Sequence, residues 1–351
     1  MSSGVQEPRA ERRLDLEAFR TMWREELRQS GGSLAGWLES QVRPGLRHAA
    51  DDFRPFTAQG RVFMNFSETL AHVLAWYKPE KIRVFNQRAW TMDPAVSDRV
   101  RARLASLIEE AVAETSDEAV RRRLLAYPVD PLAAYTAVDH LFQTLTRAPI
   151  RTVLDFGSGI GRQAFAWCEA PDVTFYSIDA IESLYLLQHE VYRRLFPERL
   201  VEYFLEPDGG VGAGRLFHLP TWRMDRVPDG SVDLIVCVQV LQEIPEVVLR
   251  HALEQFRRIA SPGGFLYIRD KEFWTPAHQV RVGRELLKQG WRLLFRFTGD
   301  EGTEIEGTPR LWVYTGGDHR RYFRAAARLK RAFLPSYRLS YGSWRDIGLP
   351  I

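Results

Sequence analysis

The chain has 351 residues, of which 45% are hydrophobic and 12% aromatic, and this composition excludes a mostly disordered protein. Its 48 Lys and Arg residues are nearly balanced by 45 Asp and Glu residues, so the net charge of +3 does not require a polyanionic partner such as a nucleic acid. The first 13 residues lack the apolar core of a signal peptide and no apolar run approaches about 18 residues, so we expect a cytoplasmic protein without a membrane span.

The first 150 residues contain helical patterns and no ladder of strands. Apolar residues recur at three- and four-residue spacing from Glu11 to Ser30, where two glycines end the predicted helix. The further helices predicted in this region, with Ser67 as the N-cap of the second, are Ser33–Val42, Ser67–Tyr77, Pro94–Glu114, Asp117–Ala126 and Pro131–Thr146.

Residues 151–183 have the pattern strand, glycine-rich turn, helix, strand. The first apolar run ends at Asp155, the second ends at Asp179, and glycines occupy positions 157, 159 and 161 between them. Such a βαβ unit has a tight turn at which the backbone can approach a ligand closely. The Asp179 carboxylate, at the end of the second strand, can accept hydrogen bonds from a ribose diol.

The glycine spacing discriminates between the ligand classes that use such a turn. A dinucleotide fingerprint needs a small residue where Arg162 stands, and a P-loop needs a G-K-[ST] triplet that this segment lacks. The remaining pattern, D-x-G-x-G-x-G with Asp179 downstream, resembles motifs I and II of the class I S-adenosylmethionine-dependent methyltransferases. A flavodoxin-like or dehydrogenase turn with an unusual third glycine is the alternative.

The resemblance implies that S-adenosylmethionine is the cofactor. The backbone of the glycine-rich turn would face the methionine moiety, Asp155 would orient the turn and the amino group of the ligand, and Asp179 would hold the ribose hydroxyls. The residues expected to contact the cofactor are Asp155, Phe156, Gly157, Ser158, Gly159, Gly161, Asp179, Ala180, Trp222, Val238 and Gln239.

The downstream segments extend the resemblance over residues 150–275. DGSVDLIVC, at residues 229–237, resembles motif IV, and ASPGGFLYIRD, at residues 260–270, resembles the element before the fifth strand of that family. Strands are expected near residues 153, 174, 216, 235, 267, 294 and 312. Further helices are expected at Glu182–Phe196, His251–Ile259, Gln279–Gln289 and from Arg320 onward.

These elements predict an α/β fold, with a Rossmann-like, seven-stranded, mostly parallel sheet whose last strand is antiparallel. A helical N-terminal region precedes the sheet. We expect a helical cap or oligomerisation region at residues 1–148, a methyltransferase core at 149–317, and a C-terminal helix and tail at 318–351. In the family that the chain resembles, N-terminal helices often cover the substrate pocket or form a dimer contact, whereas a simple packing role is the alternative here.

The adenine position departs from the family pattern. Many members have an acid after the third strand, where this chain has Thr221, Trp222 and Arg223, and Asp225 falls a few positions late. Adenine would then be held by stacking on Trp222 or by backbone, while Trp222 as a core aromatic is the alternative. Asp225, Asp229 and Asp233 are close in sequence but enter different elements, so we expect no metal site.

Methyl transfer needs alignment of nucleophile, methyl carbon and sulfur, and a hydroxyl nucleophile also benefits from a general base. Bases are expected after the fourth and fifth strands, because open α/β sheets bind ligands at the carboxyl ends of their strands. We therefore select Glu243 and Asp270 as candidate bases, with helix capping or a solvated position as the alternative for each.

The combination of these segments resembles bacterial sugar O-methyltransferases and related natural-product methyltransferases. The resemblance suggests a small-molecule acceptor, methylated on a hydroxyl oxygen, and a possible homodimer. The alternatives are N-methylation of a small molecule, an RNA or protein substrate, and a non-catalytic S-adenosylmethionine-binding protein. A nucleic-acid substrate is disfavoured, because VQVL, at residues 238–241, replaces the [DN]-P-P-[YF] motif of amino-methylating enzymes.

Overall fold

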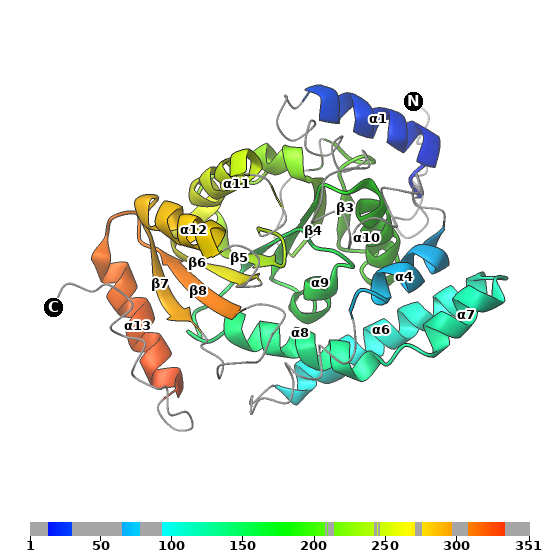
Figure 1. Cartoon of the computed structure of the whole chain (residues 1–351), viewed down its shortest axis with the longest axis horizontal. Coiled ribbons are helices and arrows are strands. Elements are labelled where there is room, and N and C mark those ends of the chain that lie inside the picture. The colour runs from blue at the N-terminus through cyan, green and yellow to red at the C-terminus, as the bar shows by residue number, and fades with distance from the viewer. Residues whose placement is uncertain are drawn as a thin grey trace, which may run out of the picture.

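The computed structural model describes residues 13–29, 65–77, 93–207, 209, 214–241, 244, 246–270, 276–296 and 308–333. Its elements form a central sheet with helices around it, as Figure 1 shows. The helix predicted at Ser33–Val42 lies outside the described residues.

The N-terminal region is helical, as predicted, and its described helices are α1 (Leu16–Gln29), α4 (Phe66–Leu74), α6 (Pro94–Glu114), α7 (Glu118–Leu125) and α8 (Val129–Gln143). Asp93 and Asp117 cap α6 and α7 by accepting backbone N–H groups of the first turn. The prediction of Ser67 as an N-cap was wrong. Asn65 caps α4 by accepting the Glu68 N–H at 2.9 Å, whereas Ser67 is buried and donates to the Ala111 carbonyl at 2.8 Å.

The sheet has eight strands in the order β3-β4-β2-β1-β5-β6-β8-β7. Only β8 runs antiparallel to its neighbours β6 and β7, so the predicted mostly parallel sheet with an antiparallel last strand is confirmed. The strand bounds are β1 (Thr152–Phe156), β2 (Thr174–Asp179), β3 (Leu200–Glu202), β4 (Leu216–Pro220), β5 (Val232–Val238), β6 (Ala260–Asp270), β7 (Trp291–Arg296) and β8 (Thr308–Tyr314).

Two details of the sheet differ from the prediction. The eighth strand, β3, is a three-residue edge strand that pairs with β4. The sequence predicts strand and loop over residues 200–214, but the predicted count of seven strands leaves this short strand out. The PGG segment at residues 262–264, which the resemblance places before the fifth strand, lies within β6, which begins at Ala260 and pairs with β5 across an irregularity between Val232 and Leu234. The glycines there accommodate a bulge instead of a reversal.

Helices lie on both sides of the sheet (Figure 1). The helices α11 (Glu246–Ile259) and α12 (Pro276–Lys288) lie together on one side, and α8 and the short α9 (Arg162–Trp167) lie on the other. The helix α10 (Glu182–Leu195) packs beside β2 and β3, and α13 (His319–Phe333) packs against β6, β7 and β8. Because the parallel strands are covered on both sides, their residues are almost all buried.

The buried side chains of the N-terminal helices and of the sheet belong to one hydrophobic cluster. Cys168 and Cys237 are buried free thiols. Among the helices that the structure describes, none combines the length and the apolar character needed to cross a membrane.

Candidate functional site

The glycine-rich turn between β1 and α9 has a backbone that only glycine accommodates easily. Gly157, Gly159 and Gly161 have φ angles of 75°, 60° and 76°, in the left-handed region. A Cβ atom on Gly157 would lie 2.4 Å from Val240 Cγ2, and one on Gly161 would lie 2.4 Å from the Tyr192 hydroxyl oxygen. Left-handed geometry and close packing therefore both explain the alternating glycines.

The Asp179 carboxylate holds this turn in place from the end of β2. Its Oδ2 atom accepts hydrogen bonds from the Gly159 N–H at 3.2 Å and the Gln188 amide at 2.8 Å, and its Oδ1 atom accepts those of Ala180 and Ile181 at 2.8 and 3.0 Å. Burial raises the pKa of Asp179, although these hydrogen bonds oppose the shift. The ribose contact stays a prediction. The ribose hydroxyls would have to share a carboxylate that already accepts four hydrogen bonds from the protein.

Asp155 is the second buried carboxyl of the turn, at the end of β1. Burial raises its pKa to about 7, against the opposing charge of Arg162. Its Oδ2 atom has no hydrogen-bond donor among the described residues. Buried carboxylate oxygens are nearly always hydrogen-bonded, so this atom is suited to receive a donor group from a ligand.

The tip of β5 lies directly against the glycine-rich turn through the Val240–Gly157 contact. Gln239 has a left-handed φ of 58°, which is uncommon for a residue other than glycine and tends to occur at functional sites. The next amide, Val240 N–H, donates to Asp270 Oδ1 at 3.2 Å. Val240 thus contacts both the glycine-rich turn and the predicted base Asp270. Burial raises the pKa of Asp270 to about 7, against the opposing charge of Arg310.

Tyr77, just after α4, is a site residue that sequence reasoning missed. Its hydroxyl oxygen lies 3.1 Å from the position that a Cβ atom would take on Gly159. The N-terminal helical region therefore reaches the cofactor turn. No local motif indicates this contact, because Tyr77 and Gly159 are distant in sequence.

A second set of polar side chains that the motifs did not indicate lies between α8, α9 and β6. Asp139 accepts hydrogen bonds from Arg162 Nη2 at 2.7 Å and from Arg269 Nε at 2.7 Å, and all three side chains are at most 5% exposed. Burial works to raise the pKa of Asp139, but the two guanidinium groups outweigh it and lower that pKa. Tyr135 also binds Arg269 through its hydroxyl.

Trp222 lies on the 3₁₀ helix η2 (Thr221–Arg226), which follows β4. Its indole N–H donates to Glu26 of α1 at 3.1 Å, and its ring lies edge-on to Trp23 at 4.5 Å between centroids. This contact joins η2 to α1, and stacking of adenine on Trp222 stays a prediction. Asp225 is bound to Arg223.

The remaining predicted cofactor residues lie at the carboxyl ends of β1, β2 and β5, as the motifs require. Ser158 donates from its hydroxyl to the Asp155 carbonyl at 2.9 Å, and Phe156 packs edge-on against Phe256. Val238 is the last residue of β5, and Ala180 follows the last residue of β2. The second candidate base, Glu243, lies outside the described residues.

The described part of the chain contains one group of three side chains with the donor atoms of a metal site, namely His189, Glu202 and His218. None of them is among the three aspartates, at positions 225, 229 and 233, that the sequence analysis considered as metal ligands. Asp229 binds Arg258, and Asp233 accepts the backbone N–H groups of Arg151 and Thr152.

The turn fits the methionine end of S-adenosylmethionine by its own chemistry. The unpartnered Asp155 Oδ2 atom can accept hydrogen bonds from an ammonium group. Asp155 and residues 157–161 would therefore hold this part of the cofactor.

A family model described as "Methyltransferase domain" matches residues 98–332. Solved structures that resemble the chain include the N-methyltransferase NodS from Bradyrhizobium japonicum with S-adenosyl-L-homocysteine (14% identity, 60% of this chain and 98% of NodS, TM-score 0.38). They also include the arsenic(III) S-adenosylmethionine methyltransferase CrArsM from Chlamydomonas reinhardtii (16% identity, 47% of this chain, TM-score 0.32), of whose length the chain covers 64%, less than two thirds. The comparison with curated proteins gave no match.

Proposed function

The chain belongs to the methyltransferase-domain family and is an S-adenosylmethionine-dependent methyltransferase, and from this premise we propose that it methylates a hydroxyl oxygen of a small molecule. The acceptor class that we favour is a sugar or another secondary metabolite. The observation that carries the proposal is the buried Asp270 carboxyl at the carboxyl end of β6.

When bound, S-adenosylmethionine supplies a methyl group on a positively charged sulfur, which makes the methyl carbon electrophilic. The chain must align the acceptor with that carbon and keep water away. Its glycine-rich turn and Asp155 suit the binding of the methionine moiety, and the contact of Val240 with Gly157 brings the tip of β5 next to this turn.

Asp270 is suited to act as the general base. An alcohol is a poor nucleophile until its proton is removed, and a base works best when its pKa lies near the working pH. Burial raises the pKa of Asp270 to about 7, whereas the Val240 N–H holds its Oδ1 atom in place at 3.2 Å. An ionised Asp270 would take the proton of the acceptor hydroxyl as the carbon–oxygen bond forms.

The position of the N-terminal helices supports a small acceptor. Tyr77 lies over Gly159, and α1 contacts η2 through Glu26 and Trp222, so parts of this region cover the carboxyl edge of the sheet. Figure 1 shows α1 and α4 beside α10, at the same end of the molecule as β3 and β4. A covered edge suits a compact acceptor better than a folded polymer.

The test is an acceptor panel assayed for release of S-adenosylhomocysteine between pH 5 and 9. With a hydroxyl acceptor, we expect kcat to rise with pH through about 7, because Asp270 is inactive as a base while it is protonated below that pKa. Asp270→Asn should lower kcat by roughly 10²–10⁴-fold and remove this rise.

Asp155→Asn is the matched control, because burial raises the pKa of this carboxyl also to about 7. It should weaken S-adenosylmethionine binding in calorimetry and leave the pH dependence of kcat in place. Turnover confined to amine acceptors, or an unchanged kcat in Asp270→Asn, would contradict the proposal.

A further inference from the structure

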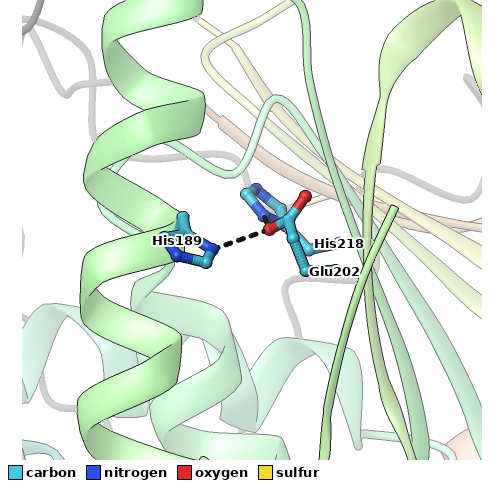
Figure 2. A group of neighbouring side chains, drawn as sticks. All are labelled: His189, Glu202 and His218. Carbon is cyan, nitrogen blue, oxygen red and sulfur yellow. Dashed lines mark hydrogen bonds and ion pairs between the residues drawn. The ribbon is translucent and has the colours of Figure 1, made fainter. Parts of the chain in front are cut away.

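A chain of buried polar side chains connects the glycine-rich turn to the edge of the sheet. It runs from Gly159 and Asp179 through Gln188 of α10 to His218 of β4 and Glu202 of β3. Gln188, His218 and Glu202 are between 0% and 3% exposed. Figure 2 shows the outer end of the chain, with Glu202 between His218 and His189 of α10.

The orientation of the Gln188 amide is determined by its neighbours. Its nitrogen lies 2.8 Å from the Gly159 carbonyl oxygen and 2.8 Å from Asp179 Oδ2. Both partners accept hydrogen bonds, so the amide must turn its two N–H groups toward them. Its oxygen then faces His218 Nε2 at 3.1 Å and the Ser177 hydroxyl at 3.2 Å.

This orientation determines the protonation of His218. Because the Gln188 oxygen can only accept, His218 Nε2 must carry a hydrogen. His218 Nδ1 lies 2.7 Å from Glu202 Oε2. His218 therefore bridges the Gln188 oxygen and the Glu202 carboxylate through its two ring nitrogens. Burial works to raise the pKa of Glu202, but His218 and His189 outweigh it and hold that pKa below its usual range.

The distances around Glu202 fit hydrogen bonds better than the coordination of a metal ion. His189 Nδ1 lies 2.9 Å from the same Oε2 atom, and Tyr185 donates its hydroxyl to Oε1 at 2.5 Å. Ligands of a tetrahedral zinc ion with bonds of roughly 2.0–2.1 Å would lie about 3.3 Å apart. The nitrogen–oxygen distances here are those of charge-assisted hydrogen bonds.

We propose that Gln188 is a positioning residue for the cofactor, held in register by the His218–Glu202 pair. Gln188 binds both sides of the turn, the Gly159 carbonyl and the carboxylate that accepts the Gly159 N–H. Without it, Asp179 and the Gly159 carbonyl would each lose one hydrogen bond. The inference rests on the S-adenosylmethionine site described above and adds a residue that does not itself touch the ligand.

The test measures S-adenosylmethionine affinity by calorimetry and the melting temperature without ligand. Gln188→Leu should weaken binding on the order of tenfold to a hundredfold, because two hydrogen bonds to the turn are lost. His218→Leu should weaken it by a smaller factor, because Gln188 keeps its contacts but loses its anchor. Gln143→Leu is the control, since Gln143 is equally buried and is hydrogen-bonded to Gln163 and Trp167. This variant should bind S-adenosylmethionine with the affinity of the wild type.

Gln188→Glu separates positioning from a purely structural role. The introduced carboxyl would face Asp179 and His218, and two neighbouring carboxylates share a proton. Affinity should therefore be weak at pH 8 and recover partly as the pH falls, because a protonated carboxyl can again donate to Asp179. Neither the wild type nor Gln143→Leu should show such a recovery at low pH.

The outcomes are distinct. Failure of the wild type to bind S-adenosylmethionine would refute the cofactor assignment itself. Normal binding by the wild type and by Gln188→Leu, or equal losses in Gln143→Leu, would overturn the role of Gln188 alone. If the variants do not fold, nitrogen NMR of the wild type still decides the matter. We expect a hydrogen on His218 Nε2 that is bound to the Gln188 oxygen, and its absence or stoichiometric bound zinc would overturn the arrangement that positions Gln188.

Discussion

Gly157 and Gly230 have similar left-handed backbones, with φ angles of 75° and 61°, but different surroundings. A Cβ atom on Gly157 would lie 2.4 Å from Val240, whereas one on Gly230 would meet no atom within 4 Å. The two positions therefore separate the cost of backbone strain from the cost of lost space beside the cofactor turn.

We expect Gly230→Ala to lower the free energy of unfolding by roughly 1–2 kcal/mol, the cost of a left-handed alanine. Gly157→Ala adds overlap with Val240 and should cost about 1–3 kcal/mol more. It should also weaken S-adenosylmethionine binding, since Val240 or the turn must move. Urea unfolding and calorimetry measure both effects, and equal behaviour of the two variants would refute the steric argument.

Carboxyl groups at the site differ in their hydrogen-bond partners. Asp179 accepts four hydrogen bonds, while Asp155 has one oxygen without a donor among the described residues. Burial raises the pKa of both, but of the two only Asp155 has an oxygen left open to a ligand. Burial therefore raises the pKa of each carboxyl, and the hydrogen-bond partners determine whether an oxygen stays available to a ligand.

At the scale of elements, α1 is attached to the sheet by aromatic side chains. Phe19 and Trp23 are 0% and 3% exposed, and Trp23 contacts Tyr185 of α10 and Trp222 of η2. The polar links of α1 include Arg20 to Glu182 and Glu26 to Tyr203 and Trp222. Surface ion pairs contribute little, so the aromatic contacts should supply most of the attachment.

Trp23→Ala should release α1 and lower the free energy of unfolding by up to about 3–5 kcal/mol. Limited proteolysis should then cut within residues 16–29 much faster than in the wild type. Met22→Ala, on the exposed side of the same helix, should change neither quantity, since Met22 is 40% exposed. Similar cleavage of both variants would show that α1 is not held by its aromatic face.

The helix α10 connects the glycine-rich turn to the edge strand β3 through one of its faces. Tyr185, Gln188, His189 and Tyr192 follow the spacing i, i+3, i+4, i+7, which places them on one side of the helix. This side carries the hydrogen bonds to Glu202, Gly159 and Asp179. Polar residues on the buried face of a helix were the available sequence signal for Gln188.

For the whole molecule, Asp139 is the point at which the helical region and the sheet are joined by charge. It lies on α8 and forms buried ion pairs with Arg162 of α9 and Arg269 of β6. The guanidinium groups lower its pKa, so its stabilising effect is present above the ordinary pKa of an aspartate and is lost as the pH falls through the lowered value.

Asp139→Asn would remove the buried carboxylate that Arg162 and Arg269 share. Breaking a buried ion pair in this way costs about 3–5 kcal/mol, and we expect a loss of that size in urea unfolding at pH 7. Asp98→Asn is the control, because the Asp98 side chain is 65% exposed in its ion pair with Arg101 and should matter by less than about 1 kcal/mol. Comparable losses would mean that Asp139 contributes no more than a surface charge.

The local elements were predictable because their signals are local. Helical spacing and capping residues identified α6 to within a residue, and the glycines with Asp155 and Asp179 identified the tight turn after β1. The parallel strands were recognisable because strands buried on both sides have continuous apolar runs. The same periodicity placed Asp270 at a strand end, but it could not separate Asn65 from Ser67 as a cap.

Tertiary structure alone decided which distant residues meet. Pairing with β4 makes a strand of Leu200–Glu202, and the packing of the N-terminal helices brings Tyr77 to Gly159 and Asp139 to Arg269. It also placed Trp222 against α1 and connected Gln188 to the buried His218–Glu202 pair. The sequence by itself determined a glycine-rich turn on a mostly parallel sheet, because backbone geometry and hydrophobic periodicity act between near neighbours. The surroundings of that turn depend on contacts between segments far apart in the chain, which no local pattern encodes.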